Sequence, residues 1–564
     1  MSKTFLEARD YLLEHRADYE TAYENFSWPD LPADFNWARD YFDSIADGND
    51  SRALHLVEAN GEQSIVTYDE LASRSRQVAN FLANLGIKRG DRILIMLKNE
   101  VPLWESMLAA LRLGAVMIPA TTLLAGADLA DRFTRGGLKL VLTNEKGVTA
   151  VDALDPSDVE GVVKVAVGNA GGDWVDFADS FSAATDFTAP EPTTTSDPLF
   201  EYFTSGTTSK PKLVRHSQVS YPVGHLSTMY WMGIKPGDVH WTLSSPGWAK
   251  HAWGCFFAPF NAQACVFVYN YDRFDAPAVL DVLVEHKVTT LCAPPTVWRY
   301  LVQEDISSYQ VAVREALSAG EPLNPEIIES VRSSWNVTIR DGYGQTETTA
   351  QIGNPPGADL KPGSMGRPMP GYTIELLDAD GTPRTEGEIS IAFVSGHPLP
   401  LMDCYADDTS KTAEVMDGNH YRTGDVAERD EDNYLTYIGR SDDVFKASGY
   451  RISPFELESV LIEHSAVAEA AVVPSPDELR GNVPKAYIAV AGGVEPDAAT
   501  AQDIFSFVRD RVSGYKLVRR LEFAELPKTI SGKIRRVDLR RREGAREGSE
   551  PRSENEFFEA DLRA

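Results

Sequence analysis

The chain has 564 residues, 43% hydrophobic and 24% charged, which is typical of globular proteins, and its length exceeds what one hydrophobic core usually covers. The formal charge of −30, from 84 acidic and 54 basic residues, argues against broad binding to nucleic acids or anionic membranes. We find no apolar run long enough to span a membrane, and the N-terminus is too acidic for a signal or transit peptide, so a soluble cytoplasmic protein is expected. The four cysteines show no C-x-x-C spacing and are predicted to be reduced.

The first half of the chain predicts an α/β fold. Residues 1–45 have helical spacing and an aromatic-rich end, and are expected to cap the first domain. A helix is predicted from a capping box at Thr67 and Glu70 to Gly86, and buried strands follow at 92–97, 114–119 and 139–143. Helices that alternate with apolar runs predict a mainly parallel sheet, which binds ligands beyond the carboxyl ends of its strands.

The second half predicts two smaller parts. Residues 373–393 alternate between apolar and polar positions and predict a β-rich subdomain. A compact α/β unit follows, with helices at 454–464 and 501–512 and strands at 468–474, 485–490 and 521–523. We therefore expect a large N-terminal domain at 1–438, a hinge at 439–443, a small C-terminal α/β domain at 444–540 and a disordered, charge-dense tail at 541–564.

Residues 202–212, YFTSGTTSKPK, have the composition of a phosphate-binding loop. Small residues such as Gly206 let backbone N–H groups approach an anion, and Lys212 adds a mobile positive charge. Further donors are the hydroxyls of Thr204, Ser205, Thr207 and Thr208. The pattern G-x-x-x-x-G-K-[ST] is absent, so this is not a Walker loop, and by composition alone a flexible linker is the alternative.

Further segments follow in a fixed order: SAGEP at 318–322, DGYGQTE at 341–347, YRTGD at 421–425, GRSDD at 439–443, SGYR at 448–451 and PKTISGK at 527–533. With the loop before them, they resemble the adenylate-forming superfamily of acyl-CoA synthetases, nonribosomal-peptide adenylation domains and luciferases. The resemblance is strongest to the medium-chain acyl-CoA synthetase branch and covers about residues 30–540. One departure is Ser209, where the family usually has glycine, so this loop is expected to be stiffer or tilted.

The resemblance implies a carboxylic acid:CoA ligase that uses ATP, Mg²⁺ and coenzyme A. The acid attacks the α-phosphorus, pyrophosphate leaves, and the acyl adenylate then passes its acyl group to CoA and releases AMP. Because negative charge spreads over phosphoryl oxygens in the transition state, hydroxyls and cations are expected at the site. The expected partners are small molecules, with no nucleic acid, and the oligomeric state, monomer or homodimer, stays open.

By resemblance, Glu347 is the expected Mg²⁺ ligand, with Thr204 and Thr346 beside the ATP phosphates. Asp425 is expected to accept both ribose hydroxyls, and Arg440 to add a positive charge nearby. The adenine is expected to lie against Gly320, Glu321, Pro322, Asp341, Gly342, Tyr343 and Gly344. The alternative for Glu347 is a solvated surface carboxylate, and for Asp425 or Arg440 it is a surface salt bridge. For the adenine residues, the alternative is a glycine turn that merely ends a strand.

The resemblance also implies that the C-terminal domain alternates between two poses about a hinge at Asp442. In the first pose Lys533 reaches the carboxylate and the α-phosphate; an ordinary exposed lysine is the alternative. In the second pose a loop lines the pantetheine tunnel, where Gly449 permits close approach of the backbone. That loop consists of Ser448, Gly449, Tyr450 and Arg451.

The acyl pocket is expected to involve Trp248, Trp253, Ala293 and Gly344, with core packing an equal alternative for both tryptophans. Lys250 and His251 are predicted to be solvated or structural. Arg480 and Lys485 are weak candidates for binding the 3′-phosphate of CoA.

Short, medium, branched and aryl acids all stay open as substrates, with fatty acid metabolism as the expected setting. A stand-alone adenylation enzyme that loads a carrier protein is the rival within the superfamily, although no carrier domain is evident in this chain. A noncatalytic nucleotide-binding scaffold is a rival from another class. The presence of Lys533, Glu347 and Asp425 argues against it.

Overall fold

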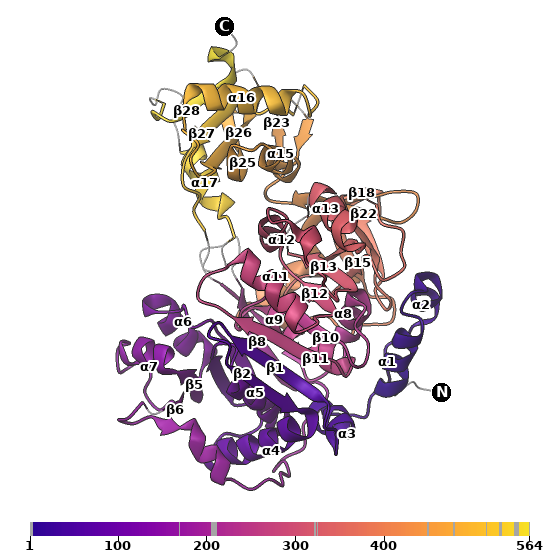
Figure 1. Cartoon of the computed structure of the whole chain (residues 1–564), viewed down its shortest axis with the longest axis vertical. Helices are drawn as coiled ribbons and strands as arrows, with labels where there is room; N and C mark the ends of the chain where they lie inside the picture. The colour runs from indigo at the N-terminus through magenta and orange to yellow at the C-terminus, as the bar shows by residue number, and fades with distance from the viewer. Residues whose placement is uncertain are drawn as a thin grey trace. The chain divides into compact units, whose positions relative to one another are not determined.

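The structure is a computed structural model (Figure 1). It describes residues 4–168, 170–204, 211–320, 323, 325–361, 363–447, 450–477, 480–514, 516–528, 533–545 and 552–562. By its packing the chain divides into two compact units. The first comprises Met1–Ile374 and Ala392–Tyr421, and the second Glu375–Ile391 and Arg422–Ala564. Within the described ranges, no helix has the length and apolar character needed to cross a bilayer.

The N-terminal residues of the first unit are helical, as predicted. They form α1 (Phe5–Glu14), α2 (Tyr19–Asn25), the π-helix η1 (Trp37–Phe42) and α3 (Asp43–Ala46). The aromatic end packs inward: Trp37 and Tyr41 are buried, the Trp37 indole donates to Asn261 Oδ1 (2.9 Å), and the Tyr41 hydroxyl donates to the carbonyl of Phe260 (2.9 Å). This segment therefore caps the first unit through its aromatic side chains.

One sheet of the first unit contains the three strands predicted near the N-terminus. Its order is β19-β9-β8-β4-β3-β5-β6-β7, and its pairs are parallel except at β8–β9 and β9–β19. The strands are β3 (Arg92–Met96), β4 (Val116–Pro119), β5 (Leu140–Asn144), β6 (Val163–Val167), β7 (Val175–Asp176), β8 (Pro198–Thr204), β9 (Lys212–Ser217) and β19 (Cys404–Tyr405). The helices in this part of the chain are α4 (Tyr68–Asn84), α5 (Val101–Leu113), α6 (Gly126–Gly136), α7 (Glu145–Asp152) and the 3-10 helix η2 (Phe177–Ser182).

The predicted capping box at the start of α4 is confirmed. The Thr67 hydroxyl accepts from the Glu70 backbone N–H (3.2 Å), and the Glu70 carboxylate accepts from the Thr67 backbone N–H (2.8 Å). Two otherwise unpaired N–H groups at the helix start are thus satisfied.

A second sheet of the first unit carries the motif strands. Its strands in this unit run in the order β16-β15-β14-β13-β12-β10-β11-β1-β2, with parallel pairing from β14 to β1. They are β1 (Arg52–Glu58), β2 (Gln63–Thr67), β10 (Val239–Thr242), β11 (Cys265–Asn270), β12 (Thr290–Cys292), β13 (Glu315–Ala319), β14 (Ile339–Tyr343), β15 (Ile352–Gly353) and β16 (Ser364–Pro368).

The helices that accompany this sheet include α8 (His225–Met232), α9 (Ala249–Ala252), the π-helix η3 (Trp253–Phe257), α10 (Ala258–Asn261), α11 (Ala276–Glu285), α12 (Pro295–Leu301), the 3-10 helix η4 (Ile306–Ser308), α13 (Pro325–Trp335) and α14 (Thr409–Val415). A buried cluster around Trp241, Phe267, Leu283 and Trp298 joins strands to helices. The carboxyl ends of β12, β13 and β14 lead directly into the predicted motifs, as expected for a parallel sheet.

The second unit begins with the predicted β-rich part. Strands β17 (Ile374–Leu377), β18 (Glu386–Ala392), β21 (His420–Arg429) and β22 (Leu435–Arg440) pair in that order. Strand β20 (Met416–Asp417), which belongs to the first unit, pairs with the first residues of β21. A small sheet of order β25-β26-β27-β28 follows. The remaining elements are β23 (Phe445–Ala447), β24 (Tyr450–Ile452), α15 (Pro454–Ile462), β25 (Val467–Asp477), β26 (Gly481–Val490), α16 (Ala498–Arg509), β27 (Arg520–Phe523), α17 (Arg536–Gly544), β28 (Glu556–Phe558) and the 3-10 helix η5 (Glu559–Asp561).

The last described residues correct the expectation of a disordered tail. Strand β28 pairs antiparallel with β27, and the Phe557 ring packs against Phe523 at 5.7 Å between ring centroids. Glu559 is buried and accepts from Arg509 (2.7 Å) and Arg519 (2.5 Å). The tail is ordered at 552–562 because its buried acidic side chains are paired with partners of opposite sign, which composition alone does not reveal.

Lys485 is a further correction, because its ammonium group is buried within the second unit. It donates to Glu522 (2.7 Å), Glu543 (2.7 Å) and Glu556 (2.8 Å), and its side chain is 0% exposed. All three donors of an ammonium group are thereby used. Lys485 is therefore a structural residue and not a ligand of the CoA phosphate.

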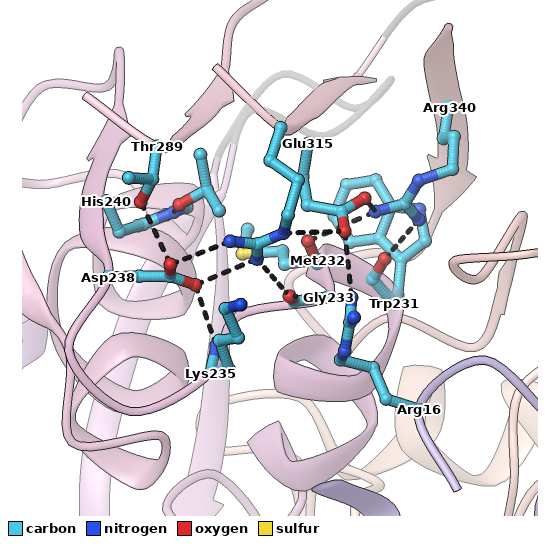
Figure 2. A network of polar contacts seen from close by, with 12 residues as sticks. Arg16, Trp231, Met232, Gly233, Lys235, Asp238, His240, Thr289, Glu315 and Arg340 are labelled. Carbon is cyan, nitrogen blue, oxygen red and sulfur yellow. Dashed lines mark hydrogen bonds and ion pairs between the residues drawn. The ribbon is translucent and has the colours of Figure 1, made fainter. Parts of the chain in front are cut away.

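A buried charge network joins the amino ends of strands β10, β13 and β14 (Figure 2). The Arg340 guanidinium donates to Glu315 Oε2 (2.8 Å) and to the backbone carbonyls of Trp231 (2.5 Å) and Met232 (3.1 Å). Glu315 Oε1 also accepts from Arg16 (2.8 Å), which follows α1. One carboxylate thus joins the N-terminal segment to the sheet.

The network continues from Glu315 toward β10. Arg314 donates to Asp238 Oδ1 (2.8 Å) and Oδ2 (2.9 Å), and Asp238 accepts from the Lys235 backbone N–H (2.9 Å) and the Thr289 hydroxyl (3.0 Å). These residues lie at the amino ends of their strands, away from the carboxyl ends that bear the motifs. We therefore interpret the network as structural.

Replacing Glu315 by glutamine should destabilise the first unit by about 3–5 kcal/mol, because the buried Arg340 charge would lose its counter-charge. The matched control is Glu329→Gln, which removes an exposed ion pair to Arg332 (2.7 Å) on α13 and should cost less than about 1 kcal/mol. Thermal and urea unfolding of both variants measure the difference. Equal losses of stability would contradict the structural interpretation.

Candidate functional site

The predicted phosphate loop connects the antiparallel strands β8 and β9. Thr204 and Lys212 are cross-strand partners at the ends of these two strands, so the loop closes a hairpin. This strand–loop–strand context agrees with the absence of a Walker pattern, since a Walker loop leads into a helix. Ser205, Gly206, Thr207, Thr208 and Ser209 lie outside the described residues.

The structure brings Lys212 and Glu347 together through a residue that was not predicted, Tyr405 on β19. The Tyr405 hydroxyl donates to Glu347 Oε1 (2.8 Å) and accepts from Lys212 Nζ (3.3 Å). The Lys212 ammonium also lies 4.8 Å from the centroid of the Tyr405 ring, within range of a cation–π contact. Glu347 and Tyr405 are both buried, at 9% and 2% exposure.

The loop that carries Thr346 and Glu347 is fixed by two buried side chains. The carbonyl of Thr346 accepts from His216 Nε2 (2.7 Å) and from the Tyr221 hydroxyl (3.4 Å). Burial lowers the pKa of His216 to about 3, so the ring is neutral near pH 7. Because a carbonyl only accepts, Nε2 carries the proton, and Nδ1 accepts from Ser220 Oγ (3.0 Å).

The side chains at this end of the sheet fit a hard divalent cation such as Mg²⁺. A carboxylate and a hydroxyl, from Glu347 and Thr204, are oxygen ligands of the kind that Mg²⁺ prefers. Among the residues that the structure describes, no group of three or more His, Cys, Asp or Glu side chains is arranged to hold a metal by itself. Mg²⁺ sites in nucleotide enzymes usually add phosphate oxygens and waters to one or two carboxylates.

The predicted adenine residues lie at the carboxyl ends of β13 and β14. Burial raises the pKa of Asp341 to about 7, although its Oδ1 accepts from the Gly342 backbone N–H (2.9 Å). A Cβ on Gly342 would lie 2.3 Å from the Trp231 ring, so packing against Trp231 alone requires glycine there. Gly320 has a positive φ of 105°, which favours glycine. Glu321 and Pro322 lie outside the described residues.

Lys250 and His251, at the start of the predicted acyl pocket, both have structural contacts. The Lys250 ammonium donates to the carbonyl of Ala319 (3.1 Å), at the end of β13. His251 is buried, its Nε2 lies 2.9 Å from Asn99 Oδ1, and burial lowers its pKa to about 3. Neither contact assigns a chemical step to these side chains.

Of the two predicted acyl-pocket tryptophans, Trp253 is the more deeply buried. Its indole donates to the Tyr221 hydroxyl (3.0 Å), and a Cβ on Gly344 would lie 2.5 Å from its ring. Trp253 thus packs directly on the motif loop. Trp248 is half-buried at the N-cap of α9, and Ala293 is buried beyond the end of β12.

The predicted ribose residues face each other within the second unit. Asp425 on β21 and Arg440 on β22 are cross-strand partners, and Arg440 Nη1 lies 3.7 Å from Asp425 Oδ1. The Tyr437 hydroxyl, which was not predicted, donates to the same oxygen (3.1 Å), and burial raises the pKa of Tyr437. Asp425 is therefore a buried carboxylate among donors, as an acceptor of vicinal hydroxyls should be.

The predicted hinge residue Asp442 lies between two arginines of the second unit. Its Oδ1 accepts from Arg440 Nε (3.4 Å), and its carbonyl accepts from Arg540 Nη1 (2.6 Å). Arg540 also pairs with Asp443. Lys533 is exposed just before α17, and the backbone of Tyr450 and Arg451 lies in β24. Ser448 and Gly449 lie outside the described residues.

Four residues were missed from the sequence: Tyr405, Tyr437, His216 and Tyr221. Each contacts a predicted site residue through a side-chain hydrogen bond from another strand or turn. A single tyrosine or histidine among apolar residues forms no motif of recognisable spacing, so the sequence alone does not mark it as functional. Only knowledge of which strands pair could have found them.

Comparisons with known proteins identify the family of the chain. The family profile for AMP-binding enzyme matches residues 42–398, and that for AMP-binding enzyme C-terminal domain matches residues 456–533. "Acyl-coenzyme A synthetase ACSM3, mitochondrial" of Rattus norvegicus is 37% identical over 552 residues, which is 95% of each chain. "4-hydroxybutyrate--CoA ligase 1" of Metallosphaera sedula is 40% identical over 534 residues, 93% of each chain.

Among solved structures, the chain is similar to the anthranilate CoA ligase AuaEII in complex with anthranoyl-AMP. The TM-score is 0.82 at 26% identity, over 91% of this chain and 98% of the other. The expectations of an α/β fold and of an AMP-forming acid–thiol ligase are confirmed. The chain belongs to the AMP-binding enzyme family, as an acyl-CoA synthetase of the adenylate-forming superfamily.

Proposed function

We propose that this acyl-CoA synthetase activates short- to medium-chain carboxylic acids, branched and aryl acids among them, in a reaction supported by Mg²⁺. The observation that carries the proposal is the cluster of Thr204, Lys212 and Glu347 at the end of the β8–β9 hairpin. A hydroxyl, a cation and a carboxylate together suit nucleotide phosphates and a divalent cation. A bound Mg²⁺ would neutralise phosphate charge there.

Each predicted residue has a defined task in this proposal. A carboxylate oxygen of the acid attacks the α-phosphorus of ATP, and the bond to pyrophosphate breaks, while Lys212 and Lys533 stabilise the charge on the phosphoryl oxygens. Asp425 accepts the ribose hydroxyls, and Arg440 neutralises charge beside them. The CoA thiol, losing its proton, then attacks the acyl carbonyl, and AMP leaves.

We also propose that the C-terminal domain moves about Asp442 between the two half-reactions. The pairs of Asp442 with Arg440 (3.4 Å) and Arg540 (3.9 Å) support a hinge here, because long, partly exposed ion pairs are weak and exchange easily. Lys533 would act in adenylation, and the segment 448–451 in thioester formation.

The acid class is supported by two relatives, which are named as an acyl-coenzyme A synthetase and as a 4-hydroxybutyrate–CoA ligase. Trp253 and Gly344, which pack directly against each other, are proposed to form one wall of the acyl pocket. Lining by Trp248 and Ala293 is part of the same proposal. A cytoplasmic location stays a prediction, since several relatives are named as mitochondrial.

A panel of acids tests this proposal: acetate to decanoate, isobutyrate, benzoate and 4-hydroxybutyrate, each with ATP and Mg²⁺, with and without CoA. We expect acid-dependent release of pyrophosphate and, with CoA, the acyl-CoA product. Acid-dependent pyrophosphate release that never yields acyl-CoA, but does acylate a carrier protein, would favour the rival adenylation enzyme.

The ribose assignment predicts that Asp425→Ala raises the KM for ATP by about tenfold or more, because buried ribose hydroxyls would lose a charged acceptor, worth about 1.5–3 kcal/mol. The KM for the acid should change little. The control Glu428→Gln alters an exposed carboxylate on the same strand and should leave both constants unchanged. An unaltered KM for ATP in a folded Asp425→Ala enzyme would rule out the assignment.

Domain alternation predicts that Lys533 and Gly449 serve different half-reactions. Lys533→Ala should slow adenylate formation by about 10²-fold or more, since a cation at the α-phosphate is lost, yet still convert supplied acyl adenylate and CoA to product. Gly449→Leu should form adenylate but fail to transfer the acyl group. Lys528→Ala, which removes an exposed lysine paired with Glu469, is the control. Equal damage to both half-reactions in either variant would contradict alternation.

A further inference from the structure

A short segment of the chain, residues 402–406, lies between the strand that carries Lys212 and the loop that carries Glu347. On one side, the Asp403 N–H donates to the Arg215 carbonyl (2.8 Å) and the Ala406 N–H donates to the Leu213 carbonyl (2.8 Å). On the other side, the Met402 N–H donates to the carbonyl of Glu347 (2.8 Å). The segment therefore links the backbone of β9 to the backbone of the loop that carries Glu347.

Tyr405, in the middle of this segment, is itself held in place. Its backbone N–H donates to the Thr412 hydroxyl (3.0 Å), and it pairs with Val214 across β19 and β9. Its side chain is 2% exposed, so the ring has little freedom to turn. The hydroxyl thus reaches Lys212 and Glu347 from a rigid base.

We propose that Tyr405 is a positioning residue that holds the Lys212 ammonium and the Glu347 carboxylate at a fixed separation for the nucleotide phosphates and the divalent cation. This inference rests on the roles proposed above for Lys212 and Glu347. The single Tyr405 hydroxyl uses both of its capacities, because it donates to the carboxylate at 2.8 Å and accepts from the ammonium at 3.3 Å.

The bridge has two physical consequences. Because the hydroxyl occupies Oε1 of Glu347, the carboxylate is oriented and presents Oε2 for a ligand. Because the hydroxyl also lies between two opposite charges, it prevents them from closing into a direct ion pair. In a buried setting such a pair would be strong, and a nucleotide would have to break it before Lys212 could reach phosphate.

The test measures binding as well as activity. The probe is Mn²⁺ as a spectroscopic substitute for Mg²⁺. It is titrated into the full-length enzyme together with α,β-methylene-ATP, an analogue that cannot transfer its adenylyl group, and binding is followed by electron paramagnetic resonance. The variants are Tyr405→Phe, Glu347→Gln and the double variant. The matched control is Tyr68→Phe, which also removes one buried tyrosine hydroxyl, bonded at 2.8 Å to the Ala264 carbonyl and remote from the motifs in sequence.

Tyr405→Phe should weaken Mn²⁺ binding about tenfold, as expected for one hydrogen bond to a charged group, and Glu347→Gln should weaken it at least as much. The double variant should bind no more weakly than Glu347→Gln alone, because the hydroxyl acts through that carboxylate. Tyr68→Phe should match the unaltered enzyme. Pyrophosphate–ATP exchange should show a raised KM for ATP in Tyr405→Phe and an unchanged KM in the control.

The outcomes separate this inference from the proposed function. Weakened binding in Glu347→Gln but unaltered binding in Tyr405→Phe would overturn the role of Tyr405 and leave the metal assignment standing. Unaltered binding in Glu347→Gln would overturn both. A loss of thermal stability in Tyr405→Phe with unaltered Mn²⁺ affinity would show that Tyr405 only supports the fold, which also contradicts the inference.

Discussion

A nucleoside triphosphate carries several negative charges, and this chain has a formal charge of −30, so the two repel each other overall. The structure therefore depends on cations that are fixed locally against the overall field. In the first unit Lys212 is held at the end of a β-hairpin by a buried tyrosine, and in the second unit Arg440 faces Asp425 across two strands. Each cation thus lies beside a carboxylate that a tyrosine hydroxyl orients, Glu347 by Tyr405 and Asp425 by Tyr437, so charge and geometry are set together.

In the second sheet, the charged residues that stabilise the fold lie at the amino ends of the strands, and the predicted ligand-binding motifs lie at the carboxyl ends. At the amino ends of β10, β13 and β14, charged side chains are paired among themselves around Glu315 and Asp238 (Figure 2). At the carboxyl ends, glycines let Trp231 and Trp253 pack directly against the motif backbone. The network anchors the strands at one end, and at the other end burial raises the pKa of Asp341 to about 7.

Local signals in the sequence predicted local structure well. The capping box at Thr67, the buried strands and the ordered motifs were all readable because each depends on residues close in the chain. The hydroxyls of Tyr405 and Tyr437 were not readable, because their roles depend on strand pairing between distant segments. Lys485 and the tail were misjudged for the same reason: the buried lysine is paired with Glu522, Glu543 and Glu556, and the last two of these lie in the segment predicted to be disordered.

The central claim is that the acid is activated as an adenylate, and the fate of the acid's oxygen tests it most directly. The enzyme would be incubated with ATP, CoA and a carboxylic acid that carries ¹⁸O at both carboxylate oxygens. The masses of the products would then be measured by mass spectrometry. Attack of the carboxylate on the α-phosphorus predicts one ¹⁸O atom in AMP and none in pyrophosphate. If the ¹⁸O label appeared in inorganic phosphate and the nucleotide product were ADP, the result would contradict activation as an adenylate.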